Sequence, residues 1–517
     1  MKINNIIGGL LLLSTTGCSG FLEEYSQTEI RASKISHYDE LLLGSVYIPS
    51  KMPGGSFILP GGGSCDFFNM LDDDVNTVSE LNIDNTGGDN YFNYTSGMLK
   101  VMFGYSAWQR DITQTEQTTH DDASTWTDLY NRIAILNTIL EEADRLDLTL
   151  EEDIHTRDRV MGECHFLRGQ FYFILANLYG KPYNLSTSAT DLAVPLKTSS
   201  GVVHEEGKDT QFSRATVKVV YDQVVKDLEA ALSYLKKQSK GVLYRASEEA
   251  AAVLLSRVYL YRQEWGKVKE LLEPYISQKL YLSTLTTTDT LTSDAPFLTE
   301  ENTEVLFSQG SLFSQVIFSG QAPDFCVSKD LYNLYEEGDV RRTCFTHHLV
   351  TDSVALMGKF RHTSHQSKVS DVLMIRSAEA WLNMAEACAM DGKNETLANT
   401  YLNQLRENRI RDYQARTYSG EELVRQIRLE RRKELCFEGH RWFDLRRYSV
   451  SDPYPYSKKI YRSYASYDYL TLIKTGTYVL EENDPAYVFD IPKTVREFDK
   501  VSMPRNERPD RPALEDK

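Results

Sequence analysis

Several groups of residues in this sequence could do chemistry, but none has the spacing of a standard catalytic or metal-binding motif. Three aspartates at 72–74 and the nearby Asn76 offer oxygen ligands for Ca²⁺, yet they lack the spacing of an EF-hand, and a solvated acidic loop is the alternative. Two histidine pairs, at 347–348 and at 362 and 365, lie 14 residues apart in an irregular stretch, which is more typical of surface histidines. The chain has no G-x-S-x-G elbow, P-loop, H-E-x-x-H or Rossmann glycine motif. We therefore predict that the protein is not an enzyme and holds no metal and no cofactor.

The charge of the chain narrows the classes of ligand that it could bind. Its 517 residues carry a formal net charge of −17, and the isoelectric point is near 5.2. Nucleic-acid binding needs a basic footprint, so we expect no nucleic-acid partner. A neutral ligand such as a sugar remains compatible with this charge.

The N-terminus has the pattern of a secretory signal that ends at a lipidated cysteine. An apolar run at 6–13 follows Lys2 and is far shorter than the about 20 residues of a membrane-spanning helix. Gly17 directly before Cys18 resembles a bacterial lipobox, and the acidic pair at 23–24 resembles the surface-export signal of Bacteroidetes lipoproteins. We predict a lipoprotein signal peptide at 1–17, lipidation of Cys18 as the membrane anchor, and a flexible tether at 18–27. The alternative is an unmodified Cys18 after an ordinary signal.

Apolar residues spaced three and four apart predict a series of amphipathic helices. Val160, Cys164 and Leu167 show this rhythm. The predicted helices span residues 37–48, 126–145, 157–179, 213–236, 247–262, 266–278, 371–390, 396–409 and 421–438. A lone helical hairpin cannot cover its apolar face, so neighbouring hairpins must stack. The predicted fold class is mainly α, with tetratricopeptide-like helical hairpin repeats and irregular, partly β loop insertions.

The insertions at 49–112, 280–370 and 449–490 lack helical rhythm, and long insertions of this kind are usually functional or disordered. Short strands are expected near Val305–Phe307 and Gln315–Phe318. The residues on helical patterns that we expect in the core are Cys164, Cys388, Cys436, Trp126, Trp265, Trp381 and Trp442.

The densest pattern is IRLERRKELCFEGHRWFDLRRY, at Ile427–Tyr448. Its arginines and glutamates at helical spacing suggest ion pairs that fix how this helix meets its neighbours. Gly439 is a plausible helix stop. A solvated charged helix is the alternative, but the aromatic residues Trp442 and Phe443 within the run count against it.

The motif ER-x-x-EL-x-x-EG-x-RW-x-DL-R in this stretch resembles the C-terminal signature of the SusD/RagB family, surface lipoproteins that capture nutrients for a partner transporter. Other segments are similar to signatures of that family, namely ECHFLRGQFYFILANLYGKPYN (163–184), RASEEAAAVLLSRVYLYRQEW (245–265), IRSAEAWLNMAEA (375–387) and LNQLRENR (402–409). The tail PRNERPDRP (504–512) departs from the usual Asn-Pro-Gly-Tyr close. The resemblance implies a single SusD-like domain at 28–517, with the helical scaffold mainly at 126–278 and 371–448.

The resemblance also implies a function at the outer membrane. The protein would be exposed on the cell surface, capture oligosaccharides, and deliver them to a SusC-like TonB-dependent transporter that it covers as a hinged lid. One alternative is the same role with peptides or glycopeptides, which titration against polysaccharides and peptide mixtures would distinguish. The other alternative is an enzyme or a purely structural adaptor, and release of reducing ends would reveal an enzyme.

Two aromatic-rich segments, 66–110 and 308–332, are the candidate binding loops. Sugar faces pack on aromatic rings and sugar hydroxyls need polar partners, so a site needs both on irregular segments over a rigid scaffold. The candidate ligand-binding residues are Tyr91, Tyr94 and Trp108 with Asp89 and Asn93 in the first segment, and Phe313, Phe318 and Phe325 in the second. For each ring, packing in the core is the alternative.

Overall fold

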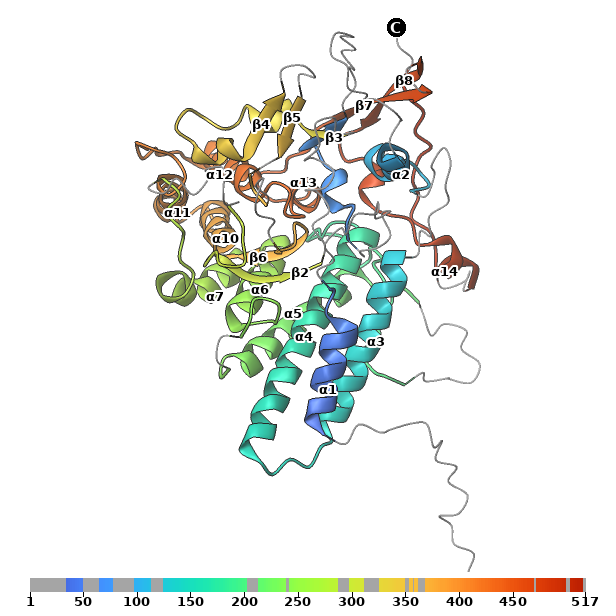
Figure 1. Ribbon diagram of the computed structural model, residues 1–517, viewed down its shortest axis with the longest axis vertical. Coiled ribbons are helices and arrows are strands. Elements are labelled where there is room, and N and C mark those ends of the chain that lie inside the picture. The colour runs from blue at the N-terminus through green and yellow to red at the C-terminus, as the bar shows by residue number, and fades with distance from the viewer. Residues whose placement is uncertain are drawn as a thin grey trace, which may run out of the picture.

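Stacked helices of residues 124–278 occupy one end of the molecule, and most of the strands lie towards the other end among further helices (Figure 1). This computed structural model describes residues 34–49, 65–77, 97–112, 124–201, 213–238, 241–286, 297–310, 325–348, 353–356, 358–360, 368–468, 471–498 and 503–514. None of the helices within these ranges is long and apolar enough to span a bilayer.

The first helical group runs from residue 124 to residue 278. It consists of α3 (Ser124–Asp144), α4 (Glu151–Tyr179), α5 (Val217–Leu235), α6 (Glu248–Tyr261) and α7 (Trp265–Gln278). Hydroxyl caps begin two of these helices, because Thr216 accepts from the Val219 N–H and Ser247 accepts from the Ala250 N–H. Each helix packs on the next, which confirms the predicted stack of hairpins.

Two glycines allow α4 and α5 to approach closely. A Cβ at Gly162 would lie 2.8 Å from Cγ of Leu235, and one at Gly169 would lie 3.0 Å from Cγ of Leu228. The two glycines are seven residues apart on α4, so they share one face. Leucines of α5 fill the space that their missing side chains leave.

A second helical group contains the charged signature. It consists of α10 (Ser377–Met390), α11 (Glu395–Glu407), α12 (Gly420–Leu435) and α13 (Arg441–Tyr448). α10 packs on α7 as well as on α11 and α12, so it joins the two groups. Near the N-terminus, α1 (Ile35–Leu41) continues into a π-helical turn, Leu42–Val46, and both pack on α3.

The strands in the described part of the chain form three antiparallel sheets. The four-stranded sheet has the order β1-β3-β5-β4, and the other two pair β2 with β6 and β7 with β8. The strands are β1 (Val75–Thr77), β2 (Val305–Gln309), β3 (Phe325–Val327), β4 (Phe345–His348), β5 (Ser353–Leu356), β6 (Leu373–Arg376), β7 (Ile460–Asp468) and β8 (Thr471–Leu480). The shorter helices near them are α2 (Gly97–Ser106), α9 (Lys329–Tyr332) and α14 (Lys493–Phe498), with 3-10 turns at Phe68–Met70, Val340–Cys344 and Pro485–Tyr487.

Two predicted helix boundaries are wrong. The helix predicted over 371–390 begins only at Ser377, because Leu373–Arg376 form the buried strand β6. The helix predicted over 421–438 ends at Leu435, since Cys436 is extended and Phe437 has a φ of +57°. The insertion at 449–490 contains the hairpin β7–β8, in agreement with the expected partly β insertions. The expected strand near Val305–Phe307 is confirmed, whereas the one at 315–318 lies outside the described residues.

The core contains the predicted helical cysteines and tryptophans. Trp126 and Trp442 are buried, and Trp265 and Trp381 are half-buried against the core. The six cysteines that the structure describes are all buried and form no disulfide. They therefore act as small apolar side chains, as predicted for Cys164, Cys388 and Cys436.

Candidate functional site

From Arg428 to its end, the signature helix α12 buries its charges instead of exposing them to solvent. The Glu434 carboxylate lies at the centre of three guanidinium groups, and Glu434 is only 1 % exposed. It accepts hydrogen bonds from Arg341 Nη1 at 2.7 Å, from Arg376 Nη1 at 2.7 Å and from Arg409 Nη2 at 3.0 Å. Burial alone would raise the pKa of the Glu434 carboxyl, but these three arginines together hold it well below its usual value. The expectation of ion pairs that fix this helix is confirmed.

Further carboxylates surround the same arginines, and we call this set the ionic core. Glu304 accepts from Arg376 at 3.1 Å and from Arg409 at 2.8 Å, while Glu438 binds Arg376 through both oxygens at 2.7 and 2.8 Å. The ionic core comprises Glu304, Asp339, Arg341, Lys359, Arg376, Arg406, Arg409, Glu430, Lys433, Glu434 and Glu438. Apart from Lys359, which lies in a loop, its members lie in or within three residues of β2, β6, the turn Val340–Cys344, α11 and α12, so the ionic core ties the sheets to the helices.

A second set of buried pairs joins three helices. Asp444 of α13 accepts from Arg431 Nε at 2.9 Å and from Arg447 Nε at 2.8 Å. Arg447 also donates to both oxygens of Glu386 on α10, at 2.7 and 2.8 Å. Burial would raise the pKa of the Asp444 carboxyl, but the two arginines lower it. The aspartate and arginines of the signature therefore position α10, α12 and α13 against one another.

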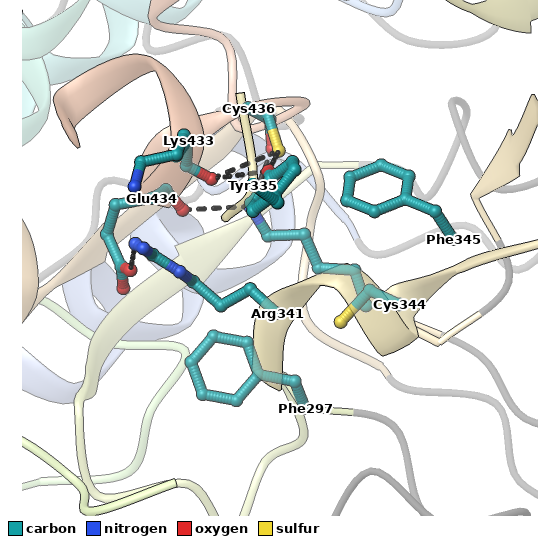
Figure 2. Close-up of a pocket in the computed structure, with 9 residues that line it drawn as sticks. Phe297, Tyr335, Arg341, Cys344, Phe345, Lys433, Glu434 and Cys436 are labelled. Carbon is teal, nitrogen blue, oxygen red and sulfur yellow. Dashed lines mark hydrogen bonds and ion pairs between the residues drawn. The ribbon is translucent and has the colours of Figure 1, made fainter. Parts of the chain in front are cut away.

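Figure 2 shows a small cavity beside the ionic core. It is lined by Phe297, Tyr335, Arg341, Cys344, Phe345, Lys359, Lys433, Glu434 and Cys436. The space open to the centre of a water molecule is about 10 Å³, which is about what one water needs and far too little for a sugar ring. Burial raises the pKa of the Cys344 thiol to about 12 and also raises that of Cys436, so neither is a ready thiolate nucleophile. The cavity is therefore a small gap in the packed interior beside the ionic core.

The three aspartates at 72–74 form a buried turn, which we call the acidic turn. The solvated-loop interpretation is therefore wrong, since the three side chains are 1–6 % exposed. Their carboxylate oxygens lie within 4.8 Å of one another, as a metal site would require. However, Arg432, Arg441 and Lys458 already pair with Asp73 or Asp74.

Asn76 does not join this cluster. It is exposed, and its Oδ1 accepts from the Thr77 N–H at 2.9 Å. Because Arg432, Arg441 and Lys458 already occupy Asp73 and one oxygen of Asp74, the cluster leaves few free carboxylate oxygens for Ca²⁺, which takes six to eight oxygen ligands. The donor set therefore fits ion pairing better than Ca²⁺ binding.

Of the candidate ligand-binding residues, the structure describes only two, and it buries both. Trp108 is 1 % exposed, and its indole Nε1 donates to the Leu71 carbonyl at 2.7 Å while the Arg462 guanidinium lies 5.2 Å from the ring centroid. Phe325 is 0 % exposed in β3. We expected both rings to be exposed to ligand, and the structure corrects this expectation, because both rings pack inside the protein. Asp89, Tyr91, Asn93, Tyr94, Phe313, Phe318 and the lipidation residue Cys18 lie outside the described residues.

The strand register brings the two candidate segments to one place on the frame. β1 pairs antiparallel with β3, with Val75 opposite Val327 and Thr77 opposite Phe325. Thr77 directly precedes residues 78–96, and Phe325 directly follows residues 311–324. Within the two candidate segments, the chain therefore enters residues 78–96 and leaves residues 311–324 at neighbouring positions of one strand pair.

We expect Trp108→Phe to lower the free energy of unfolding by about 1–3 kcal/mol, because the buried Leu71 carbonyl loses its donor. Denaturant unfolding would measure the loss, with Trp265→Phe as the control, since Trp265 is only half-buried. Ligand affinity should not change beyond the effect of stability. A loss of affinity with unaltered stability would instead place Trp108 in contact with ligand.

Two family models match this chain, one in each half. Residues 64–260 match the family described as "Starch-binding associating with outer membrane", and residues 346–500, which contain the charged signature, match the SusD family. The chain belongs to the SusD/RagB family. This family is associated with the outer membrane, and its members are known as binding proteins rather than enzymes.

Solved structures of SusD superfamily proteins share the fold. One from Bacteroides thetaiotaomicron has a TM-score of 0.68 and 21 % identity, with coverage of 92 % of this chain and 100 % of its own. A SusD-like carbohydrate binding protein from Bacteroides vulgatus has a TM-score of 0.66 and 21 % identity, with coverage of 91 % and 97 %. The predicted fold class, helical repeats with small sheets, is confirmed. SusD-like protein P25 from Formosa agariphila is 24 % identical over 284 residues, a match that spans 51 % of this chain and 44 % of that relative.

Sequence reasoning missed the partners of the signature, although the motifs contain them. Arg376 and Glu386 lie in IRSAEAWLNMAEA, and Arg406 and Arg409 lie in LNQLRENR. Each segment taken alone is an ordinary helix pattern. The one available signal was the repeated occurrence of arginine or glutamate in otherwise apolar stretches, which is unusual unless the charges are paired.

Proposed function

We propose that this SusD-family protein captures oligosaccharides or polysaccharide fragments at the cell surface and passes them to a SusC-like TonB-dependent outer-membrane transporter. Cys18 would carry the lipid that anchors it to the outer membrane. The family match supports a carbohydrate ligand, since the matched family is described as starch-binding. The capture step is non-catalytic.

One structural observation supports the choice of particular ligand-binding residues. The paired strands β1 and β3 join both candidate segments to a frame that buried ion pairs hold together. A rigid frame lets irregular loops present aromatic rings and polar groups at a fixed spacing. We therefore propose that the ligand contacts Tyr91, Tyr94, Asp89 and Asn93 from one segment, and Phe313 and Phe318 from the other.

Isothermal titration of the purified protein against a panel of neutral polysaccharides and peptide mixtures tests this function. We expect Tyr91→Ala and Tyr94→Ala each to weaken glycan binding about tenfold. One stacking ring contributes about 1.4 kcal/mol to binding, and losing this much free energy lowers the affinity by a factor of about ten. Tyr281→Ala is the matched control, because Tyr281 is 64 % exposed and lies just after α7.

Three outcomes would count against the proposal. Binding of peptides but not glycans would favour the peptide alternative. Sustained release of reducing ends by the pure protein would make it an enzyme. Failure to recover a barrel partner after purification in mild detergent would remove the transporter from the proposal.

A further inference from the structure

The acidic turn is partnered very unevenly. Asp73 has most of the cationic partners. Both of its oxygens accept hydrogen bonds from Arg441, at 2.7 and 3.0 Å, and Lys458 donates to it at 2.8 Å. Asp74 accepts from Arg432 Nε at 2.6 Å through Oδ1 only. Its Oδ2 is buried and accepts no hydrogen bond from the described residues.

Asp72 has still less support for a negative charge. Its Oδ1 accepts from the backbone N–H of Asp74 at 2.9 Å, and no lysine or arginine of the described chain pairs with its carboxylate. Arg462 approaches closely but donates to the Asp72 backbone carbonyl at 2.6 Å. Asp72 is only 3 % exposed, so water offers little compensation.

The groups that face this pair come from every neighbouring element. They are Asp73 in the same turn, Arg432 of α12, Cys436 just after α12, Arg441 of α13, Lys458 before β7, Arg462 of β7 and Tyr487 of the turn Pro485–Tyr487. Arg441 and Lys458 pair with Asp73, and Arg432 pairs with Asp73 and with one oxygen of Asp74. Arg462 donates to a backbone carbonyl through Nη2, and its Nε and Nη1 have no hydrogen-bond partner among the described residues. Within the described residues, Arg432 is the one cation that pairs directly with Asp72 or Asp74, and two buried carboxyl groups this close with a single direct partner are costly to ionise together.

We propose that the Asp72–Asp74 pair holds one proton at neutral pH, and that loss of this proton loosens the acidic turn where it leads into β1. The proton removes one of three crowded negative charges. The same turn continues into β1, whose pairing with β3 joins both candidate binding segments to the frame. The attachment of these segments is therefore sensitive to pH.

The electrostatics of the pair agree with this geometry. Burial, followed by repulsion from Asp74 and Asp73, raises the pKa of the Asp72 carboxyl well above its usual value. Burial also raises the pKa of Asp74, against the pull of Arg432. A carboxyl whose folded pKa is raised contributes most stability below its unfolded pKa of about 3.9, and this contribution is lost as the pH rises through the folded pKa.

Asp72→Asn tests the proposal, because asparagine keeps the acceptor for the Asp74 N–H but cannot ionise. We expect the variant to melt above the wild type at about pH 8, with a difference that grows by about 1 °C for each pH unit above about pH 5. An infrared band of a protonated carboxyl should be present in the wild type at neutral pH and absent from the variant. Amide exchange at Thr77 and Phe325 should accelerate with pH more steeply in the wild type, after correction for the intrinsic rate.

Asp73→Asn is the matched control. It removes the carboxylate that Arg441 and Lys458 share, so it should lower the melting temperature at every pH. If Asp72→Asn does not fold, Asp74→Asn is titrated in its place, and the infrared band of the wild type still decides. A wild-type protein without this band, or a melting difference that is constant between about pH 5 and pH 8, would overturn the proposal.

Discussion

Replacing Glu434 by Gln should lower the free energy of unfolding by about 3–5 kcal/mol, the usual cost of removing one partner from a buried ion pair. Glutamine keeps the shape of the side chain but leaves Arg341, Arg376 and Arg409 facing a neutral amide. Each of these arginines is at most 3 % exposed, so water cannot replace the lost charge. Equilibrium unfolding in denaturant, monitored by far-ultraviolet circular dichroism, would measure the loss.

The same helix provides a matched control for this change. Glu422 also accepts from an arginine, Arg425 Nε at 2.7 Å, but the pair lies on the surface of α12. Glu422→Gln should leave the unfolding midpoint unchanged, because solvent and salt screen an exposed pair. Equal losses for the two variants would contradict the view that burial gives the ionic core its importance.

The ionic core and the acidic turn should respond to pH in opposite directions. The pKa of Glu434 lies well below its usual value, so its contribution to stability is present above the unfolded pKa of about 4.3 and is lost as the pH falls through the folded pKa. The raised pKa of Asp72 has the reverse effect, with stability lost as the pH rises. The wild type should consequently be weakened by acid at the ionic core and by base at the acidic turn.

The helical part of the fold could be predicted because its information is local. Apolar spacing along α4 and α5 reports which face is buried, and capping residues such as Thr216 and Ser247 lie next to the helices they begin. The hairpin β7–β8 lacks such a signal. Its buried face carries Arg462, which is 0 % exposed, between Ile460 and Tyr464, so polarity does not alternate along the strand.

The candidate site depends on contacts between residues far apart in the sequence. The aspartates at 72–74 were recognisable as a cluster, but their partners Arg432 and Arg441 lie more than 350 positions later. Nothing in the local pattern distinguishes a buried, paired turn from a solvated loop. Trp108 illustrates the same limit, because its burial depends on Leu71 and Arg462.

Replacing Gly439 by Ala should lower the free energy of unfolding by about 2–5 kcal/mol. Its φ of +74° lies in the left-handed region, which costs an ordinary residue about 1–2 kcal/mol. A Cβ there would lie 2.5 Å from the carbonyl oxygen of Val372, just before β6, and such overpacking costs about a further 1–3 kcal/mol. The backbone around Gly439 cannot easily shift, because its N–H donates to Asn69 Oδ1 at 2.9 Å.

Gly392→Ala separates the two causes. Gly392 has a similar φ of +67°, but a Cβ there would meet no heavy atom within 4 Å. Gly392→Ala should therefore lower the free energy of unfolding by only about 1–2 kcal/mol, which is the cost of the left-handed backbone. The difference between the two variants measures the clash with Val372. Since the clash would push β6 away from α12, Gly439→Ala should also weaken the pairing of Arg376 with Glu434. Combining Gly439→Ala with Glu434→Gln should then cost less than the sum of the separate losses, whereas full additivity would show that the glycine acts independently of the ionic core.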